Sequence, residues 1–182
     1  NTPFIINNAL VTVKEAAKKA GIKMELYAAA EYMLDDYFLE LLRSKSPLLT
    51  LHKNIILTEI SYSTAPDNLN MILAEIIAEG YQPILAHPER YHYYHNNYKK
   101  YQQLKEMGFN LQVNILSLTG YYGKSVKKAA RYILDNKLAS LVGTDLHHHN
   151  HLQALTDDKN KKNIIKYLGT NIYNNLDTIL KT

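Results

Sequence analysis

Apolar side chains follow two patterns along the chain, one with helical spacing and one of short continuous runs. A spacing of three to four residues predicts an amphipathic helix over residues 3–20, with Thr2 as its cap, Pro3 in its first turn and Gly21 at its end. Shorter apolar runs between such stretches predict strands. The predicted strands are residues 24–30, 54–58, 83–86, 109–113 and 138–142; the other predicted helices cover 35–42, 69–77, a segment ending at 107, 124–136, and two or three segments after 150.

Strands that alternate with helices predict βαβ units around a mostly parallel sheet, in one α/β domain over residues 1–182. Polar side chains follow directly after the predicted strands: Glu31, Glu59, His87, Asn114 and Asp145. In a β/α barrel the carboxyl ends of the strands carry the chemistry, so we expect these side chains to meet. A doubly wound open sheet is the competing topology, but the sequence lacks the glycine-rich phosphate loop usual there.

Composition narrows the chemistry. The 182 residues are 46% hydrophobic and 21% charged, which suits one globular domain. The net charge of +4 comes from scattered basic residues, which argues against nucleic-acid binding. Without cysteine, thiolate chemistry is excluded, and a metal ion would be held by His, Asp and Glu, which suits manganese, iron or zinc. With no visible signal peptide or apolar segment of membrane-spanning length, we expect a cytoplasmic protein without membrane insertion.

Two clusters carry most of the candidate chemistry. Residues 86–91 read Ala-His-Pro-Glu-Arg-Tyr, and residues 143–151 read Gly-Thr-Asp-Leu-His-His-His-Asn-His. Each follows an apolar run and offers histidine or carboxylate ligands for a metal ion. A single His-Pro after a strand is most often a surface turn, but two such strand ends in one chain favour an active site.

These clusters, with Ala-Ala-Glu-Tyr at 29–32 and Leu-Ser-Leu-Thr-Gly-Tyr-Tyr-Gly at 116–123, resemble the metal-dependent tyrosine phosphatases of bacterial capsule and exopolysaccharide clusters. Those proteins form a branch of the polymerase-and-histidinol-phosphatase (PHP) superfamily. The resemblance implies a distorted seven-stranded, TIM-like β/α barrel, of which about five βα units lie in this chain. It also implies a cluster of up to three metal ions, usually manganese, with iron or zinc as alternatives.

By the same resemblance, Glu31, His87, Asp145 and His147 correspond to metal ligands, and Arg90 to the arginine that holds the substrate phosphate. Glu31 could instead be a carboxylate at a helix start, and His87 a satisfied loop histidine. Arg90 could instead pair structurally with Glu89 or Glu59. The remaining candidates are expected to support the metal ligands or to lie on the surface. They are Glu59, His148, His149 and His151. Tyr91 is expected to contact substrate, although a tyrosine here is more often packing.

The implied activity is hydrolysis of phosphotyrosine on a bacterial tyrosine kinase that regulates capsular or exopolysaccharide biosynthesis. Metal ions would lower the pKa of a bridging water to give hydroxide near neutral pH. Arg90 would bind a phosphoryl oxygen through its N–H donors. A small-molecule PHP phosphoesterase, such as one acting on histidinol phosphate, and a non-catalytic binding protein with a degenerate metal site are the alternatives.

The sequence departs from the family at its start. Family members begin with a His-x-His strand, and another histidine ligand lies on their second strand; neither is in this sequence. The interpretation is that the first two βα units are missing. We therefore expect this piece alone to bind metal weakly and to be nearly inactive. Its open sheet edges are expected to aggregate or to pair with another chain, with a homo-oligomer as one option.

Overall fold

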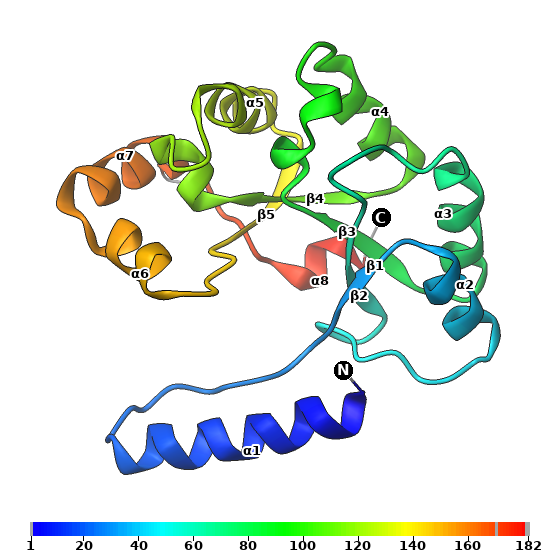
Figure 1. Ribbon diagram of the computed structural model, residues 1–182, viewed down its shortest axis with the longest axis horizontal. Coiled ribbons are helices and arrows are strands. Elements are labelled where there is room, and N and C mark those ends of the chain that lie inside the picture. Colours follow the sequence, from blue (N-terminus) through cyan, green and yellow to red (C-terminus); the bar gives the residue numbers. More distant parts are fainter. Residues whose placement is uncertain (1, 170, 181–182) are drawn as a thin grey trace.

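A computed structural model describes residues 2–169 and 171–180, so both ends of the predicted domain range 1–182 lie outside the described residues. Five strands form one parallel sheet in the order β1-β2-β3-β4-β5 (Figure 1). The strands are β1 (Glu31–Met33), β2 (Ile55–Glu59), β3 (Gln82–Ala86), β4 (Asn110–Asn114) and β5 (Ala139–Gly143). Each strand lies beside the next in chain order, which is the order of a barrel wall; a doubly wound sheet would reverse its order. The predicted α/β class and barrel-type order are confirmed.

The helices begin and end close to where the apolar spacing places them. They are α1 (Pro3–Lys19), α2 (Asp36–Arg43), α3 (Leu69–Ala78), α4 (Lys99–Met107), α5 (Lys124–Asp135), α6 (His149–Thr156), α7 (Asp158–Leu168) and α8 (Leu176–Ile179), with short 3₁₀ helices η1 (Pro88–Arg90), η2 (His92–Tyr94) and η3 (Ile115–Thr119). The Thr2 side chain accepts a hydrogen bond from the amide of Ile5, and Asp35 caps α2 in the same way through the amide of Phe38.

The predicted strand at 24–30 is wrong. The segment is extended but unpaired, and the strand starts at Glu31, which pairs with Leu57 of β2. Met24 and Tyr27 are exposed, and the amide of Ala30 donates to the carbonyl of Leu49 (3.1 Å) outside the sheet. A short apolar run makes a strand only where a neighbouring strand pairs with its backbone hydrogen-bonding groups. Glu31 therefore begins β1 and does not follow it.

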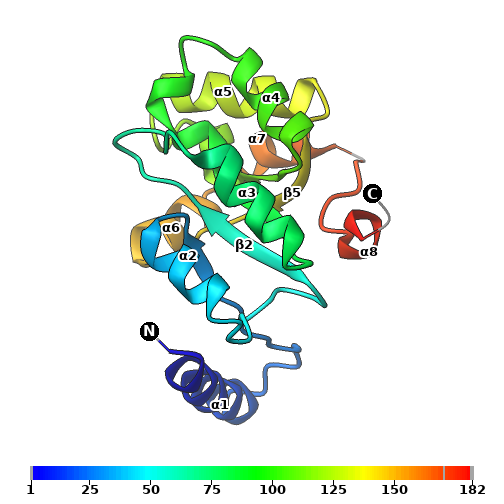
Figure 2. The same ribbon diagram turned by 90° about the vertical axis from the view of Figure 1, so that its right-hand side faces the viewer.

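The main core lies between the sheet and the helices that cover its outer face. Figure 2 shows α3 crossing that face next to β2. Ile56, Ile76 and Leu111 are fully buried in this layer. Alternate residues of the strands face the other way, where Ile55, Ile84 and Leu141 pack against Ile179 of α8. The short terminal helix thus covers the inner face of the sheet.

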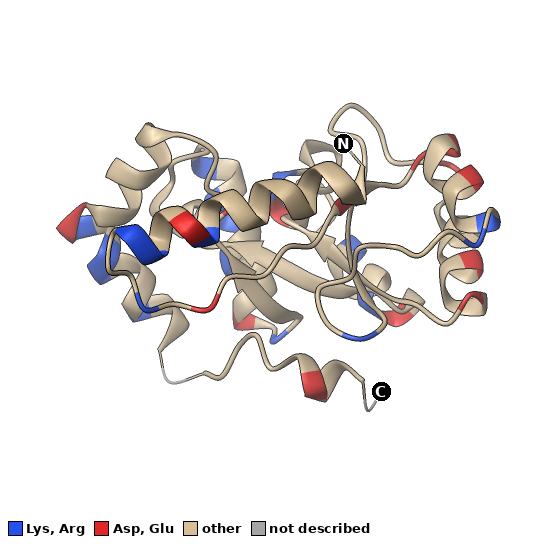
Figure 3. Cartoon of the chain, turned by 90° about the horizontal axis from the view of Figure 1, so that it is seen from below, with Lys and Arg blue, Asp and Glu red and all other residues tan. Residues whose placement is uncertain are grey.

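Helix α1 lies apart from these layers (Figure 1). It buries none of its residues, and Phe4 is 75% exposed. Viewed from below, α1 crosses in front of the sheet, and Lys and Arg are spread over several elements (Figure 3). Within the described ranges, no helix combines the length and apolar character needed to cross a membrane.

The two edges of the sheet differ. At β5, the amide of Val142 donates to the Asn174 side chain (2.9 Å), and the amide of Asn174 donates to the carbonyl of Ser140 (3.3 Å). The segment before α8 thus covers this edge, and the expectation that it would be open is wrong. Beside β1, by contrast, lies a hollow of about 760 Å³ lined by residues of α1, α2 and β1. In the described part of the chain, β2 is the only strand that pairs with β1.

Two neighbouring isoleucines of α3 test which helix face carries the core. Ile76 is fully buried and Ile77 is 51% exposed. We expect Ile76→Ala to lower the free energy of unfolding by about 2–4 kcal/mol, because it leaves a cavity. Ile77→Ala should change it by less than about 0.5 kcal/mol. Urea unfolding followed by circular dichroism measures both, and equal losses would contradict the packing of α3 described above.

Candidate functional site

One pocket collects the polar side chains at the carboxyl end of the sheet. Its volume is about 490 Å³. It is lined by Glu31, Glu59, Tyr62, His87, Arg90, Tyr121, Tyr122, Asp145, His147, His148 and His151. The sequence prediction that strand ends and following loops converge is therefore confirmed for most of the candidate residues. Three of the candidates do not line the pocket: Asn114, His149 and Tyr91.

Three side chains form the tightest group of metal-type donors among the described residues. Glu31, Glu59 and His87 each offer one ligand atom within 4.8 Å of the others. His87 Nε2 is 3.2 Å from Glu31 Oε1 and 3.8 Å from Glu59 Oε2. The imidazole is buried, whereas both carboxylates keep contact with solvent. Glu59, expected only as a supporting group, thus lies as deep in the cluster as Glu31.

The electrostatics of this trio favour a cation. Burial raises the pKa of Glu59, and the negative charge of Glu31 raises it further. A positive ion between the carboxylates would remove that repulsion. Two carboxylate oxygens and one imidazole nitrogen are donors that suit manganese, iron or zinc. The residues present therefore fit a divalent metal ion.

Two pocket residues have left-handed backbone conformations. His87 has φ +36° after β3, and Asp145 has φ +47° after β5. Such conformations cost about 1–3 kcal/mol for residues other than glycine, and they cluster at functional sites. The amide of His87 donates to the carbonyl of Gln112 on β4 (2.7 Å), which anchors the turn to the neighbouring strand.

Glu89 anchors the same turn from the inside. It is fully buried, and its Oε1 accepts hydrogen bonds from the amide of Asn114 (2.9 Å) and from Ser117 Oγ (2.7 Å). Burial raises the pKa of Glu89. The Glu89 carbonyl lies 2.7 Å from His95 Nε2. Glu89 is therefore held by β4 and η3 and does not pair with Arg90.

Arg90 projects into the pocket and pairs with Asp145. Its Nη1 donates to Asp145 Oδ2 at 2.5 Å, in a partly buried setting. Arg90 does not pair with Glu89 or Glu59, which were the alternative partners. Among the described residues, no acceptor lies within hydrogen-bond reach of Nη2 or Nε. The guanidinium thus presents donors beside the carboxylate and imidazole trio.

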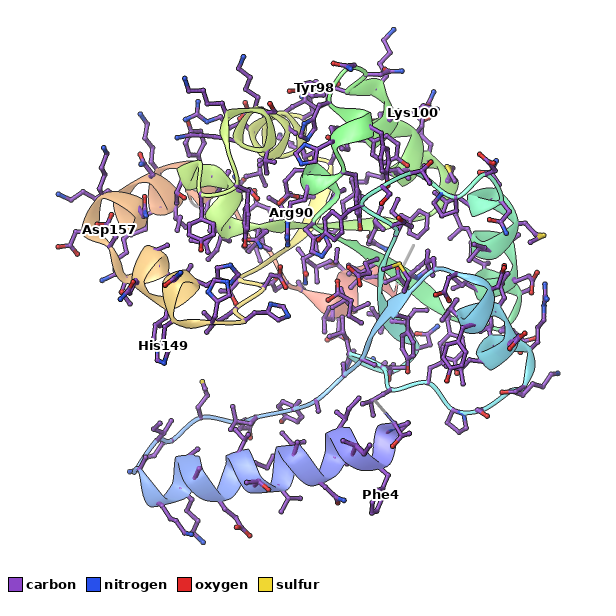
Figure 4. The ribbon with its side chains drawn as sticks, viewed as in Figure 1. Phe4, Arg90, Tyr98, Lys100, His149 and Asp157 are labelled. Atoms are coloured by element: carbon purple, nitrogen blue, oxygen red, sulfur yellow. The ribbon has the colours of Figure 1, made fainter. Side chains whose placement is uncertain are left out.

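The histidines after Asp145 occupy different places. His147 is exposed, with Nδ1 3.1 Å from Asp145 Oδ1, and lies outside the tight trio. His151 is buried and its Nδ1 is 3.1 Å from the carbonyl of Asp145, so it supports that turn. The ring of His148 packs on His151 with centroids 3.8 Å apart. His149 points away from the body on the outer side of α6 (Figure 4).

The expectation that Tyr91 contacts substrate is wrong. Its side chain is fully buried, its hydroxyl donates to the carbonyl of Ala86 (3.2 Å) and accepts from the amide of Ile60 (3.1 Å). Sequence reasoning missed Tyr62, which lines the pocket with its ring stacked on His87 at 5.6 Å. No motif marks Tyr62; the available signal was its place three residues after the strand-end Glu59.

Comparison with known proteins identifies the family. The family model described as capsular polysaccharide synthesis, CpsB/CapC, matches residues 1–180. The tyrosine-protein phosphatase CpsB of Streptococcus pneumoniae is 32% identical over 141 residues, which cover 74% of this chain and 58% of that protein. CpsB of Streptococcus agalactiae is 30% identical over 149 residues, covering 79% and 61%. The chain thus spans about three fifths of the length of these relatives.

A solved structure shows the same fold. It comes from the crystal structures of YwqE from Bacillus subtilis and CpsB from Streptococcus pneumoniae, described as unique metal-dependent tyrosine phosphatases. The match has a TM-score of 0.77 at 22% identity and covers 98% of this chain and 70% of the other. Because the family model matches nearly the whole of this chain, the chain belongs to the CpsB/CapC family of capsular polysaccharide synthesis proteins.

Proposed function

We propose that this chain carries most of the site of a metal-dependent phosphomonoester hydrolase that acts on phosphotyrosine. The observation that supports this best is the placement of Glu31, Glu59 and His87 beside the Arg90 guanidinium in one pocket. Metal-type donors and an anion-binding cation in one pocket suit a phosphate ester. Relatives named tyrosine-protein phosphatases support the same substrate class.

The proposed roles follow from position. Glu31, Glu59 and His87 hold a metal ion, and Asp145 and His147 at the facing side of the pocket contribute to further ions. Manganese, iron and zinc all match these donors. A bound divalent ion supplies Lewis-acid chemistry, which offsets phosphoryl charge and makes water a better nucleophile. Arg90 orients the phosphoryl group through its N–H donors.

For the physiological role, we propose a phosphotyrosine on a bacterial tyrosine kinase that regulates capsule or exopolysaccharide synthesis, with the reaction in the cytoplasm. The family description supports the link to capsule synthesis. We also propose that two further βα units complete the barrel and the ligand set. The hollow beside β1, next to Glu31, supports this place for them.

Metal content and turnover test this proposal together. We would measure bound metal by elemental analysis, and release of phosphate from a phosphotyrosine peptide, for this chain and for a version extended upstream. The extended protein should bind more than one ion and turn over, and this chain should bind little metal and turn over poorly. Histidinol phosphate serves as the competing substrate, and a preference for it would contradict the phosphotyrosine assignment. No turnover by either protein would favour a binding role.

His87 and Glu31 should each be needed for metal binding. We expect His87→Ala and Glu31→Gln to weaken Mn²⁺ binding by at least about tenfold, because each removes a donor from the trio. Mn²⁺ titration followed by electron paramagnetic resonance measures this. His52→Ala is the matched control, since His52 is partly exposed and pairs with Asp177 away from the pocket. Equal loss in the control would show that the titration reports surface binding.

Glu59 should favour metal binding at a cost in stability. Its pKa is raised in the folded chain, so the folded state holds this proton more tightly than the unfolded state does. Ionisation of Glu59 therefore lowers stability as the pH rises from about 4.3 through the raised folded pKa. We expect Glu59→Gln to raise the free energy of unfolding of the metal-free chain at pH 7, because the substitution removes the charge that burial and Glu31 disfavour.

The gain from Glu59→Gln should shrink toward about pH 3, where Glu59 is mostly protonated in both the folded and the unfolded state. The substitution should also weaken Mn²⁺ binding at pH 7, because it removes a donor from the trio. Urea unfolding at the two pH values measures the gain. Glu79→Gln, at the exposed end of α3, is the control and should change neither property. A variant less stable than the parent at pH 7 would show that Glu59 is not under electrostatic strain.

A further inference from the structure

The Arg90 guanidinium lies between two tyrosine rings. Its Cζ is 5.1 Å from the centroid of the Tyr62 ring and 4.5 Å from that of the Tyr122 ring. Both distances are within the range of about 6 Å over which a cation is attracted to an aromatic face. Tyr62 comes from the segment between β2 and α3, and Tyr122 from the turn between η3 and α5. Two separate loops thus hold one cation near the centre of the molecule (Figure 4).

Tyr62 is fixed by the histidine of the metal-type trio. Its ring is stacked on His87 at an interplanar angle of 18° and lies tilted against the buried Tyr91 at 5.5 Å. Its hydroxyl is 3.3 Å from His87 Nδ1. The ring that faces Arg90 therefore also contacts the imidazole, so the cation and His87 share one neighbour.

Tyr122 is fixed from the opposite side. Asn114 Nδ2 donates to its hydroxyl (3.3 Å), and that hydroxyl is 3.4 Å from His151 Nε2. Tyr121 packs edge-on against the same ring, at 4.9 Å between centroids. Asn114 ends β4, so the sheet itself sets the position of the Tyr122 ring.

The charges suit this arrangement. Burial raises the pKa of both phenols above their ordinary value, so the rings stay neutral at neutral pH. Burial works against the charge of Arg90, and the neighbouring carboxylate of Asp145 favours it. Two neutral rings within cation–π distance stabilise the cation. Nη1 is engaged with Asp145, and in the described part of the chain Nε and Nη2 keep their donors for another acceptor.

Simple packing does not account for these two tyrosines. Core tyrosines such as Tyr91 and Tyr101 are fully buried, whereas Tyr62 is 40% exposed and lines the pocket. Tyr122 is also partly exposed there. A side chain placed for the core alone would bury its ring. The Tyr62 and Tyr122 rings instead each contact the Arg90 guanidinium.

We propose that Tyr62 and Tyr122 are positioning residues, which hold the Arg90 guanidinium in the plane that receives phosphoryl oxygens. The inference rests on the proposed function, because it assigns phosphate binding to Arg90. Arginine otherwise loses considerable rotamer freedom when it binds an anion. With the plane already held, less of that freedom is lost on binding, and the anion binds more tightly.

Inorganic phosphate binding by the full metal-free chain tests the proposal without any need for turnover. Phosphate titration followed by phosphorus NMR gives the affinity. We expect Tyr62→Ala and Tyr122→Ala each to weaken binding by about three- to tenfold, because each removes one cation–π contact. Tyr62→Phe and Tyr122→Phe keep the faces and should restore the affinity to within about twofold. Leu at either position keeps apolar volume without a π face, and should behave like Ala.

Tyr167→Ala is the matched control. Tyr167 stacks on Arg131 with Cζ 4.4 Å from its ring centroid, the same kind of contact outside the pocket, so its loss should leave phosphate affinity unchanged. If Arg90→Ala weakens binding but the tyrosine variants to Ala and Leu do not, the positioning role is overturned. Phe variants as weak as Ala would also overturn it. If Arg90→Ala leaves phosphate binding unchanged, the phosphate-binding part of the proposed function fails instead.

Discussion

The site depends on one constraint, the parallel register that brings two carboxylates to one imidazole. Glu31 of β1 pairs with Leu57, which lies two residues before Glu59 on the same face of β2, and Thr58 pairs with Leu85 near the end of β3. Folding must bury part of Glu59 and hold it close to Glu31, and the raised pKa of Glu59 reflects first this burial and then the repulsion from Glu31. Burial of the apolar layer on the outer face of the sheet stabilises the fold and offsets this electrostatic cost. A rigid sheet can hold like charges together; a loop of similar composition would let them separate.

The turn after β3 explains how one short motif serves two tasks. In a 3₁₀ helix, residues three apart lie on the same side. His87 precedes η1 and Arg90 ends it, so both face the pocket, whereas Glu89 between them faces the interior. The buried Glu89 carboxyl binds β4 and η3, and this fixes the rotation of the turn. Proline directly after His87 restricts the backbone at the same point.

Local signals were enough for most elements, and they failed where the answer depends on a neighbour. The spacing of Leu69, Ile72 and Ile76 defines a helix whatever it packs against, and the structure buries all three. Residues 24–30 form a short, mostly apolar run like that of a strand, but no pattern within them shows that a partner strand is absent there. Tyr91 is the last residue of the 86–91 cluster, yet the turn places it in the core. Tyr62 joins the site because the segment after β2 lies against His87 at the end of β3, and no pattern in the sequence marks that contact.

Asp145 links the anion-binding and metal-binding halves of the pocket. One of its oxygens accepts from Arg90, and the other lies 3.1 Å from His147 Nδ1. A metal ion that binds the Asp145 carboxylate and a phosphate that binds Arg90 would both change the Arg90–Asp145 ion pair. The binding free energy of the metal ion would therefore depend on whether phosphate is bound, and the reverse. The rings of Tyr62 and Tyr122 lie within cation–π distance of Arg90, whereas Asp145 accepts a hydrogen bond from its Nη1. The guanidinium can therefore exchange Asp145 for another acceptor while the aromatic faces keep its plane.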